Sequence, residues 1–352
     1  GPVEGLITAD EETGMFGAEG LPTNTLNSDV LLNLDSETWG KFVIGSAGGV
    51  DVTADLEYKE VETDANDAAL QVTVKGLKGG HSGDDIDKKR ANAIKILSRF
   101  LYMTQEKMDL RLVSFNSGKL HNAIPRDGKV VFAIPAAEKE NVRAAWNVFA
   151  ANVEDEFHVS DVEMEFYMQS TEAQSVIEKE CSVRIIRALQ AVDNGVYSMC
   201  QDKALETMVE TSSNIAVVKT EENEIEVLAS QRSNVMSNLD NECNTIQAVF
   251  QLAGAEVEQN DGYPAWKMKA DSKLTKLAVD SYVKLFGKEP IVRGIHAGLE
   301  CGLFSERYPN MDMVSFGPTL RFVHTPDEKL HIPTVQMVWD HLLDIMKNVP
   351  AK

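Results

Sequence analysis

Two adjacent glutamates are the first residues in the sequence that are able to do chemistry. Glu11 and Glu12 follow the short apolar run of residues 3–9, which predicts a buried strand with carboxylates at its end. Two like charges side by side in a crevice are costly unless a cation or a proton compensates them. One glutamate is thus able to bind a metal ion while the other takes a proton from metal-bound water, whose pKa the metal lowers towards roughly 7. The alternative is an acidic turn at the start of a helix.

Asp35 is a carboxylate in a comparable position. It follows the apolar run of residues 29–34, which predicts a second strand. Because the ligand crevice of an open α/β sheet lies at the carboxyl ends of its strands, two strands that end in acids indicate one shared site. Carboxylate oxygen suits zinc, manganese or cobalt. Alternatively, Asp35 caps the turn that follows it.

Two histidines lie in loops from which a side chain is able to reach a reacting group. His324 follows an apolar strand, and its neutral imidazole suits a metal, with Asp327 or Glu328 orienting the ring. The alternative is a surface histidine. His81 lies in the glycine-rich stretch 79–83, where it is able to donate to the oxyanion of a tetrahedral intermediate. A helix cap with an incidental histidine is equally consistent with this stretch.

Three further polar clusters occur at residues 121–125, 230–233 and 296–302. In the second cluster, Arg232 is able to pair bidentately with a substrate carboxylate. Its alternative is a surface ion pair. Spacing alone assigns no role to the other two clusters.

Hydrophobic periodicity predicts the elements that must position these residues. After Gly48 and Gly49 the pattern changes from buried parallel strands to alternating strands and amphipathic helices, and from about residue 271 it returns to helix, strand, helix, strand, helix. The predicted strands are 70–74, 111–115, 129–134, 163–168, 291–295 and 313–316, with a hairpin at 214–230 that turns at 221–224. The predicted helices are 94–101, 142–157, 173–191 and one opened by Pro333. We therefore predict an α/β fold, with a catalytic α/β domain (residues 1–48 and 263–352) interrupted by an inserted α+β lid (residues 49–262).

Composition limits the classes of protein and partner. The chain has 352 residues, 43% hydrophobic and 25% charged, which is enough for two domains. Its net charge of −21 argues against nucleic acid or an anionic membrane surface as a partner. No apolar stretch approaches the roughly 18–20 residues that span a bilayer, and no signal peptide is recognisable. Four scattered cysteines favour reduced thiols and a cytoplasmic location.

Six ordered segments together resemble the aminoacyl-histidine (Xaa-His, or cytosol nonspecific) dipeptidases, within the larger group of co-catalytic zinc peptidases. The resemblance runs along nearly the whole chain. It rests on LITADEETGMFGAEGL at 6–21, LLNLDSE at 31–37, GLKGGHSGDDIDKKRAN at 76–92, HNAIPR at 121–126, IHAGLECGLF at 295–304 and SFGPTLRFVHTPDE at 315–328.

The resemblance implies a role for each candidate residue. Glu11 would be the general base, Glu12 and His324 ligands of one zinc ion, and Asp35 a ligand of the other. The oxyanion would be stabilised by His81. Contacts to the substrate backbone and its C-terminal carboxylate would come from the residues Asn122, Arg232 and His296. Dipeptides as substrates, zinc as the metal (with manganese or cobalt possible) and a homodimer are further implications.

One departure from the family pattern leaves alternatives open. The family has an upstream H-x-D motif and an aspartate that bridges both metals, and neither is found in this sequence. We therefore expect weak zinc binding and little hydrolysis from these 352 residues alone. A non-catalytic fragment or homologue that serves as a dimerisation or ligand-binding module is the competing class. A deacylase or tripeptidase would differ only in substrate, and the His81 and Asn122 segments favour dipeptides.

Overall fold

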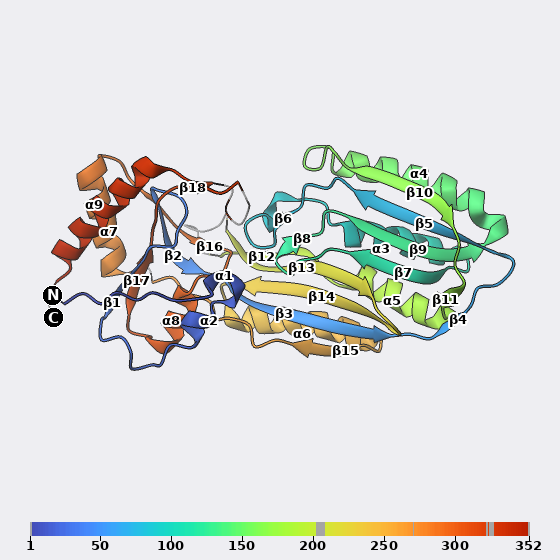
Figure 1. Cartoon of the computed structure of the whole chain (residues 1–352), viewed down its shortest axis with the longest axis horizontal. Helices are drawn as coiled ribbons and strands as arrows, with labels where there is room; N and C mark the ends of the chain where they lie inside the picture. Colours follow the sequence, from blue (N-terminus) through green and yellow to red (C-terminus); the bar gives the residue numbers. More distant parts are fainter. Residues whose placement is uncertain (1, 202–207, 270, 322, 324–326, 351–352) are drawn as a thin grey trace.

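Two β-sheets, each with its own helices, lie end to end in an elongated molecule (Figure 1). The computed structural model describes residues 2–201, 208–269, 271–321, 323 and 327–350, with the side chains at positions 12 and 13 excepted. Both ends of the described chain lie at the far end of the smaller sheet (Figure 1).

The smaller sheet has four strands in the order β1-β17-β2-β16. Their bounds are β1 (Val30–Asn33), β17 (Asp312–Ser315), β2 (Lys41–Ser46) and β16 (Ile291–Ile295). Strand β1 is parallel to β17 and β16 is parallel to β2, while β17 and β2 are antiparallel. The sheet therefore joins the beginning and the end of the chain.

Helices cover both faces of the four-stranded sheet, because neighbouring residues of a strand point to opposite faces. Phe42 and Val314 pack with α7 (Lys273–Phe286) and α9 (Ile332–Asn348). Their neighbours Val43 and Met313 pack on the opposite face with α2 (Phe16–Glu19) and α8 (Cys301–Arg307). The short helix α1 (Glu11–Gly14) precedes α2. These layers confirm the predicted α/β class.

The larger sheet has nine antiparallel strands, with β12 attached to β13 beside the main order. That order is β10 (Glu165–Thr171), β5 (Asp67–Lys75), β9 (Gly128–Pro135), β7 (Arg111–Ser117), β13 (Val209–Thr220), β14 (Glu224–Ser233), β3 (Gly48–Glu57) and β15 (Glu256–Gln259), with β12 at Gly195–Met199. Three two-stranded pairs accompany the sheets: β4 (Glu60–Glu62) with β11 (Ser175–Ile177), β6 (Gly80–His81) with β8 (Ala123–Ile124), and β18 (Leu320–Arg321) with β19 (Lys329–Leu330).

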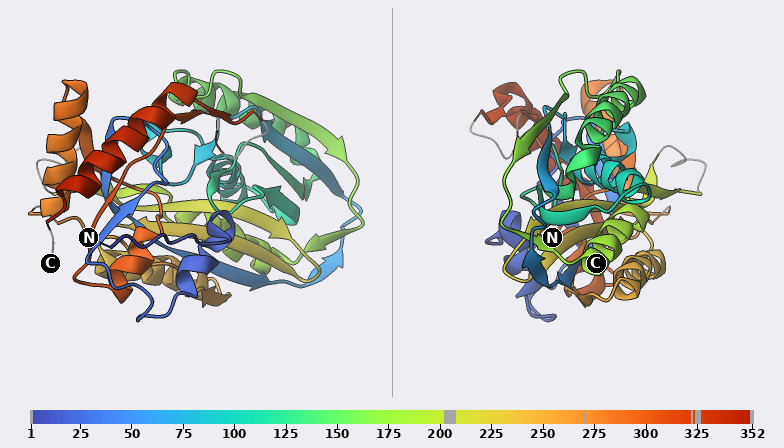
Figure 2. Two further views of the ribbon diagram at one scale, coloured as in Figure 1. Left: turned by 60° about the vertical axis from the view of Figure 1, so that its left-hand side comes forward. Right: turned by 90° about the vertical axis from the view of Figure 1, so that its right-hand side faces the viewer.

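Four helices lie along one face of the larger sheet (Figures 1 and 2). They are α3 (Ala93–Gln105), α4 (Lys139–Glu156), α5 (Lys179–Ala191) and α6 (Met236–Leu252), and two short 3₁₀ turns occur at Ile86–Lys88 and Ala136–Glu138. Asn92 caps α3 by accepting hydrogen bonds from the Ile94 and Lys95 amides. In β14, Ala229 faces the helices while Ser230 and Arg232 face away from them. One face of this sheet is therefore a core and the other carries polar side chains.

The chain passes between the two sheets twice, and the two passages pair with each other. An antiparallel bridge joins Ser46 to Trp266 and another joins Gly49 to Tyr263. Both amides of each pair donate across, at 3.0–3.1 Å between Ser46 and Trp266 and 2.9–3.0 Å between Gly49 and Tyr263. We call residues 46–49 and 263–266 the crossing. The predicted domain boundaries at 48/49 and 262/263 fall in it and stay a prediction.

Two element predictions were wrong. Residues 3–9 form no strand, and the side chain of Ile7 is 96% exposed, because no described strand lies beside this segment to accept its hydrogen bonds. The helix predicted for 173–191 begins only at Lys179, since residues Ser175–Ile177 pair with β4. The other predicted strands and helices are confirmed, with shifts of a few residues at their ends. Pro333 does open the last helix.

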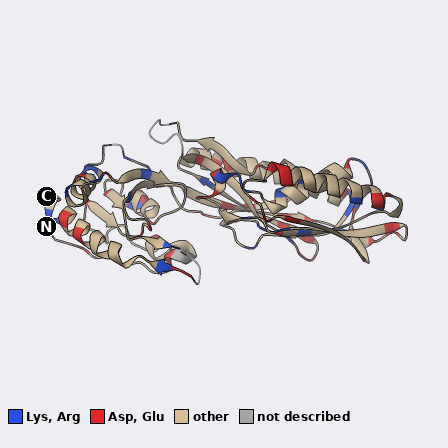
Figure 3. Cartoon of the chain, turned by 90° about the horizontal axis from the view of Figure 1, so that it is seen from above, with Lys and Arg blue, Asp and Glu red and all other residues tan. Residues whose placement is uncertain are grey.

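Charge and cysteine usage agree with the composition. Acidic and basic residues are interspersed over both parts of the molecule (Figure 3). All four cysteines are free thiols, and two of them are buried. Among the described helices, none is both long and apolar enough to cross a membrane.

Candidate active site

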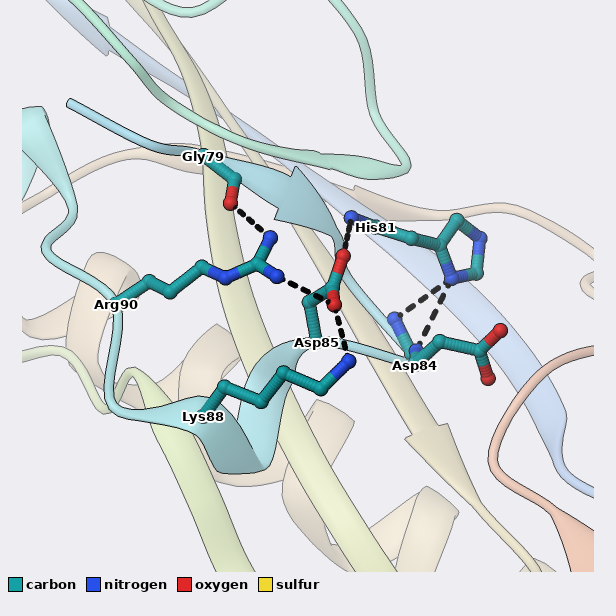
Figure 4. Close-up of polar contacts among 7 residues, drawn as sticks. Gly79, His81, Asp84, Asp85, Lys88 and Arg90 are labelled. Atoms are coloured by element: carbon teal, nitrogen blue, oxygen red, sulfur yellow. Dashed lines mark hydrogen bonds and ion pairs between the residues drawn. The ribbon is translucent and has the colours of Figure 1, made fainter. Parts of the chain in front are cut away.

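The loop that carries His81 is held by an anionic centre, Asp85 (Figure 4). The carboxylate of Asp85 accepts the His81 amide at 2.9 Å, the Lys88 ammonium at 2.5 Å and the Arg90 guanidinium at 2.8 Å. Burial alone would raise the pKa of Asp85, but these hydrogen bonds and the two cations lower it overall. Arg90 also donates to the Gly79 carbonyl. The backbone around His81 is thus fixed by charge-assisted bonds from both sides.

The imidazole of His81 has a defined tautomer. Its Nδ1 accepts the amides of Gly83 and Asp84, each at 3.2 Å (Figure 4). In a neutral imidazole one nitrogen accepts and the other carries the proton, so the proton of His81 lies on Nε2. A fixed N–H donor on a half-buried ring is what stabilisation of an oxyanion requires.

Arg232 is buried, with 5% of its surface exposed, so the alternative of a surface ion pair is wrong. Its Nε donates to the Ser82 hydroxyl at 3.2 Å, and its Nη1 donates to the Tyr263 hydroxyl at 2.5 Å. Asp51 lies close enough that its charge and that of Arg232 interact. A buried guanidinium held mainly by neutral hydroxyls keeps most of its positive charge for a ligand.

His296 is buried in a polar environment and is neutral. Its Nε2 lies 2.7 Å from the Ser212 hydroxyl, and its Nδ1 lies 3.4 Å from Oδ1 of Asn234. Burial, followed by the positive charge of Arg232, lowers the pKa of His296 to about 3. At neutral pH the ring therefore exchanges hydrogen bonds without adding charge.

Four of the predicted residues are brought together. The Ser82 amide, next to His81, donates to the Asn122 carbonyl at 2.8 Å, and the Ser82 hydroxyl contacts Arg232. A Cβ placed on Gly83 would lie only 2.2 Å from the His296 carbonyl oxygen, so the His81 loop packs directly on the His296 loop. The residues of this group, which we call the polar cluster, are His81, Asn122, Arg232 and His296.

The predicted carboxylates lie at the smaller sheet. Glu11 begins α1 and is half-buried, while Asp35 is exposed just beyond β1. Buried Glu300 lies between these segments, since it shares a hydrogen bond with Thr8 and feels the charge of Asp35. Burial and Asp35 together raise the pKa of Glu300, although the hydrogen bond from Thr8 opposes this. Glu300 Oε1 has no hydrogen-bond partner among the described residues.

His324 and the side chain of Glu12, two of the predicted metal ligands, lie outside the described residues. In the part of the chain that the structure describes, no three His, Cys, Asp or Glu residues are arranged to hold a metal ion. Carboxylate oxygens nevertheless suit a divalent cation such as zinc, and the charges of Asp35 and of Glu300, whose Oε1 has no hydrogen-bond partner among the described residues, interact.

Sequence reasoning missed several residues that contact the candidates. Ser82 follows His81 directly and Glu300 lies in the same segment as His296, so both were within reach of a motif argument. Asp51 and Tyr263 carry no motif, and only the position of Tyr263 at the predicted domain boundary was a signal. Ser212 belongs to an ordinary strand.

Comparison with known proteins decides the family. A model of peptidase family M20/M25/M40 matches residues 1–348. The chain belongs to this family. The cytosol non-specific dipeptidase of Escherichia coli (strain K12) is 39% identical over 354 residues, which cover 100% of this chain and 72% of that protein.

A solved structure agrees with the sequence match. The crystal structure of aminoacylhistidine dipeptidase from Vibrio alginolyticus matches with a TM-score of 0.89 at 42% identity, and the match covers 98% of this chain and 70% of that one. The predicted family resemblance is thus confirmed, and this M20 peptidase is a hydrolase of peptide bonds.

Proposed function

We propose that this peptidase hydrolyses dipeptides, including those of the Xaa-His type, with broad specificity. The observation that carries the proposal is the buried guanidinium of Arg232, which lies in one polar cluster with His81 and His296. A cation fixed at a short distance from the reacting groups recognises the C-terminal carboxylate of a short peptide. The dipeptidase names of the relatives in Escherichia coli and Vibrio alginolyticus point to the same substrate class.

Each member of the polar cluster has a role in this proposal. The Nε2 proton of His81 stabilises the oxyanion that forms on the scissile carbonyl. Arg232 binds the C-terminal carboxylate, and Asn122 and neutral His296 bind the substrate backbone. Because Arg232 and His296 are buried and the donor of His81 is fixed, little reorganisation is needed as charge develops on the substrate.

The proposed metal is zinc, bound as two ions, with manganese or cobalt as substitutes. Glu12 and His324 would hold one ion and Asp35 the other, and Glu11 would act as the general base. The support from this chain is the electrostatic interaction of Asp35 with buried Glu300, two like charges that a cation would stabilise. Zinc bound there supplies a Lewis acid and a water of lowered pKa.

The proposal also includes the domain arrangement, the cellular location and the oligomeric state. Residues 49–262 would form a lid inserted into the catalytic domain, so that substrate is enclosed between the two sheets. The protein would act in the cytoplasm as a homodimer. The free thiols and the cytosolic relative support the location.

The test is metal-dependent hydrolysis by the full-length protein. We expect turnover of Xaa-His and other dipeptides, its loss after zinc is removed by a chelator, and its recovery when zinc is returned. Glu11→Gln should lower kcat by about 10²–10⁴-fold, the range for loss of a general base. The matched control is Glu19→Gln, at an exposed glutamate of α2.

Two outcomes would contradict the proposal. Binding of dipeptides without any turnover by the zinc-loaded protein would favour the non-catalytic ligand-binding module. Faster turnover of tripeptides or acylated amino acids than of dipeptides would move the substrate class within the same family.

A further inference from the structure

The guanidinium of Arg232 is anchored from two different parts of the chain. Ser82 contacts Nε from the His81 loop, and Tyr263 contacts Nη1 from the crossing. Both anchors are hydroxyls, which hold the direction of the guanidinium without neutralising it. Burial raises the pKa of Tyr263, so its phenol keeps its proton at neutral pH.

Tyr263 is itself held tightly on both sides. Its backbone exchanges two hydrogen bonds with Gly49, at 2.9 and 3.0 Å. A Cβ on Gly49 would lie 2.5 Å from the Tyr263 hydroxyl oxygen, and a Cβ on Gly298 would lie 2.7 Å from its ring carbon Cε2. The phenol therefore fits a slot between strand β3 of the larger sheet and the His296 loop of the smaller sheet, a slot that only glycine leaves open.

One carboxylate, Asp51, also acts on the guanidinium and on the phenol through its charge. Asp51 lies on the same face of β3 as Gly49 and accepts a hydrogen bond from His121 at 2.9 Å. Burial alone would raise the pKa of Asp51, but His121, Ser230 and Arg232 lower it overall. Asp51 is thus an anion with two hydrogen-bonding partners, His121 and Ser230, and Arg232 acts on it only through its charge. In the described part of the chain, the guanidinium donates to Ser82 and Tyr263 and makes no hydrogen bond to Asp51.

We propose that Tyr263 is a positioning residue that orients the Arg232 guanidinium towards the substrate carboxylate. Through Tyr263, this orientation depends on how the two sheets pack together. The inference rests on the proposed function, in which Arg232 binds the carboxylate. Tyr263 touches Arg232 in β14, Gly49 in β3 and Gly298 beside His296. A change in the angle between the sheets would therefore move the guanidinium relative to the His296 loop.

The test compares Tyr263→Phe with the wild-type full-length protein. Phenylalanine keeps the ring in its slot and removes only the hydroxyl, and an unchanged Tm would show that the fold is kept. The probes are two inert dipeptide analogues with a reduced CH₂–NH bond, one with a free C-terminal carboxylate and one with a C-terminal amide. The matched control is Tyr308→Phe, which removes a hydroxyl that donates to the Pro22 carbonyl and accepts from the Leu26 amide, and so does not touch Arg232.

Loss of one hydrogen bond to a charged group predicts about 10-fold weaker binding of the carboxylate analogue by Tyr263→Phe. The affinity of Tyr263→Phe for the amide analogue should stay within about 2-fold of the wild-type affinity, because this analogue has no carboxylate for Arg232 to bind. In turnover of dipeptides, KM should rise about 10-fold while kcat changes little. Tyr308→Phe should match wild type with both analogues.

Equal losses for both analogues, or no loss at all, would overturn the role of Tyr263. Arg232→Met in the same assay separates this failure from failure of the proposed function. If Arg232→Met keeps the preference for the carboxylate, the proposed role of Arg232 is wrong. If Arg232→Met abolishes the preference and Tyr263→Phe preserves it, only the role of Tyr263 is wrong. In the double variant, Tyr263→Phe should have no further effect.

Discussion

The buried carboxylate of Glu242 should make the free energy of unfolding depend measurably on pH. Glu242 is fully buried on α6, and neither of its oxygens has a hydrogen-bond partner among the described residues. Burial, and then the charge of Asp193, raises its pKa above the ordinary 4.5. Above pH 4.5 the unfolded chain releases the Glu242 proton while the folded chain still holds it. The free energy of unfolding should therefore fall as the pH rises from 4.5 to the raised pKa of Glu242, and should level off above it.

Glu242→Met removes the titrating group and fills its place with an apolar side chain. At pH 7 we expect a gain of about 1 kcal/mol in the free energy of unfolding, measured with urea. The difference between variant and wild type should shrink towards pH 4. Glu154→Met, at an exposed position of α4, is the control and should show neither effect. A gain that does not depend on pH would contradict this account of Glu242.

At the scale of residues, the sequence identifies groups by type but not by contact. His81 and Arg232 stand out because an imidazole among glycines and a guanidinium among serines are chemically conspicuous. The burial of Arg232 depends on which face of β14 it occupies and on Tyr263 from a distant segment. That information arises only when the strands pair, so the choice between a surface ion pair and a buried cation stayed open.

At the scale of elements, Lys95 joins two helices of the larger part. Its ammonium donates to the carbonyls of Leu189, Gln190 and Val192, at 2.8–2.9 Å, and so satisfies the end of α5 from a position on α3. Burial lowers the pKa of Lys95 to about 8, and the side chain is still mostly charged at pH 7. A cation at a helix C-terminus is also favoured by the helix dipole.

Lys95→Met should therefore destabilise the protein. It leaves three carbonyls at the end of α5 without their donor, and we expect a loss of about 2–3 kcal/mol in the free energy of unfolding by urea at pH 7. Lys276→Met, at an exposed position of α7, should change it by less than about 0.5 kcal/mol. An equal effect of both substitutions would mean that Lys95 does not cap α5.

Helices and hairpins were predictable where periodicity is strong, as in α3 and in the β13–β14 hairpin, whose Thr220 pairs with Ile225 at the turn. Residues 3–9 were not, because an apolar run forms a strand only beside a neighbour that pairs with it. The predicted start of α5 was wrong for a related reason, because residues before Lys179 pair with β4 although their sequence pattern is helical.

At the scale of the whole molecule, the two sheets meet closely at the polar cluster. Gly83 of the His81 loop packs on the carbonyl of His296, and the space is too small for a methyl group. Gly83→Ala should push the two loops apart and lower kcat/KM for dipeptides by 10-fold or more, since small displacements of positioned groups cost about 10²-fold. Gly5→Ala is the control, because nothing lies within 4 Å of its Cβ position. Unchanged kinetics of Gly83→Ala would contradict a site shared by both sheets.

The family and the α/β class were predictable because six motifs occur in order along the chain. The arrangement of the two sheets was less accessible, because the crossing rests on backbone bonds such as those of Ser46 with Trp266, which leave no pattern in the sequence. For the metal ligands Glu12 and His324, the motifs are the only basis of the prediction, because both side chains lie outside the described residues.

The most direct test of the account is the dependence of hydrolysis on the substrate carboxylate. We would measure kcat/KM of the zinc-loaded, full-length protein for an Xaa-His dipeptide and for its C-terminal amide, with wild type and Arg232→Met. Wild type should prefer the free carboxylate by about 100-fold, the value of one or two charge-assisted hydrogen bonds, and Arg232→Met should lose that preference while still cleaving the amide at the wild-type rate. Equal loss of activity on both substrates, or an intact preference, would contradict the claim that Arg232 selects dipeptides by their carboxylate.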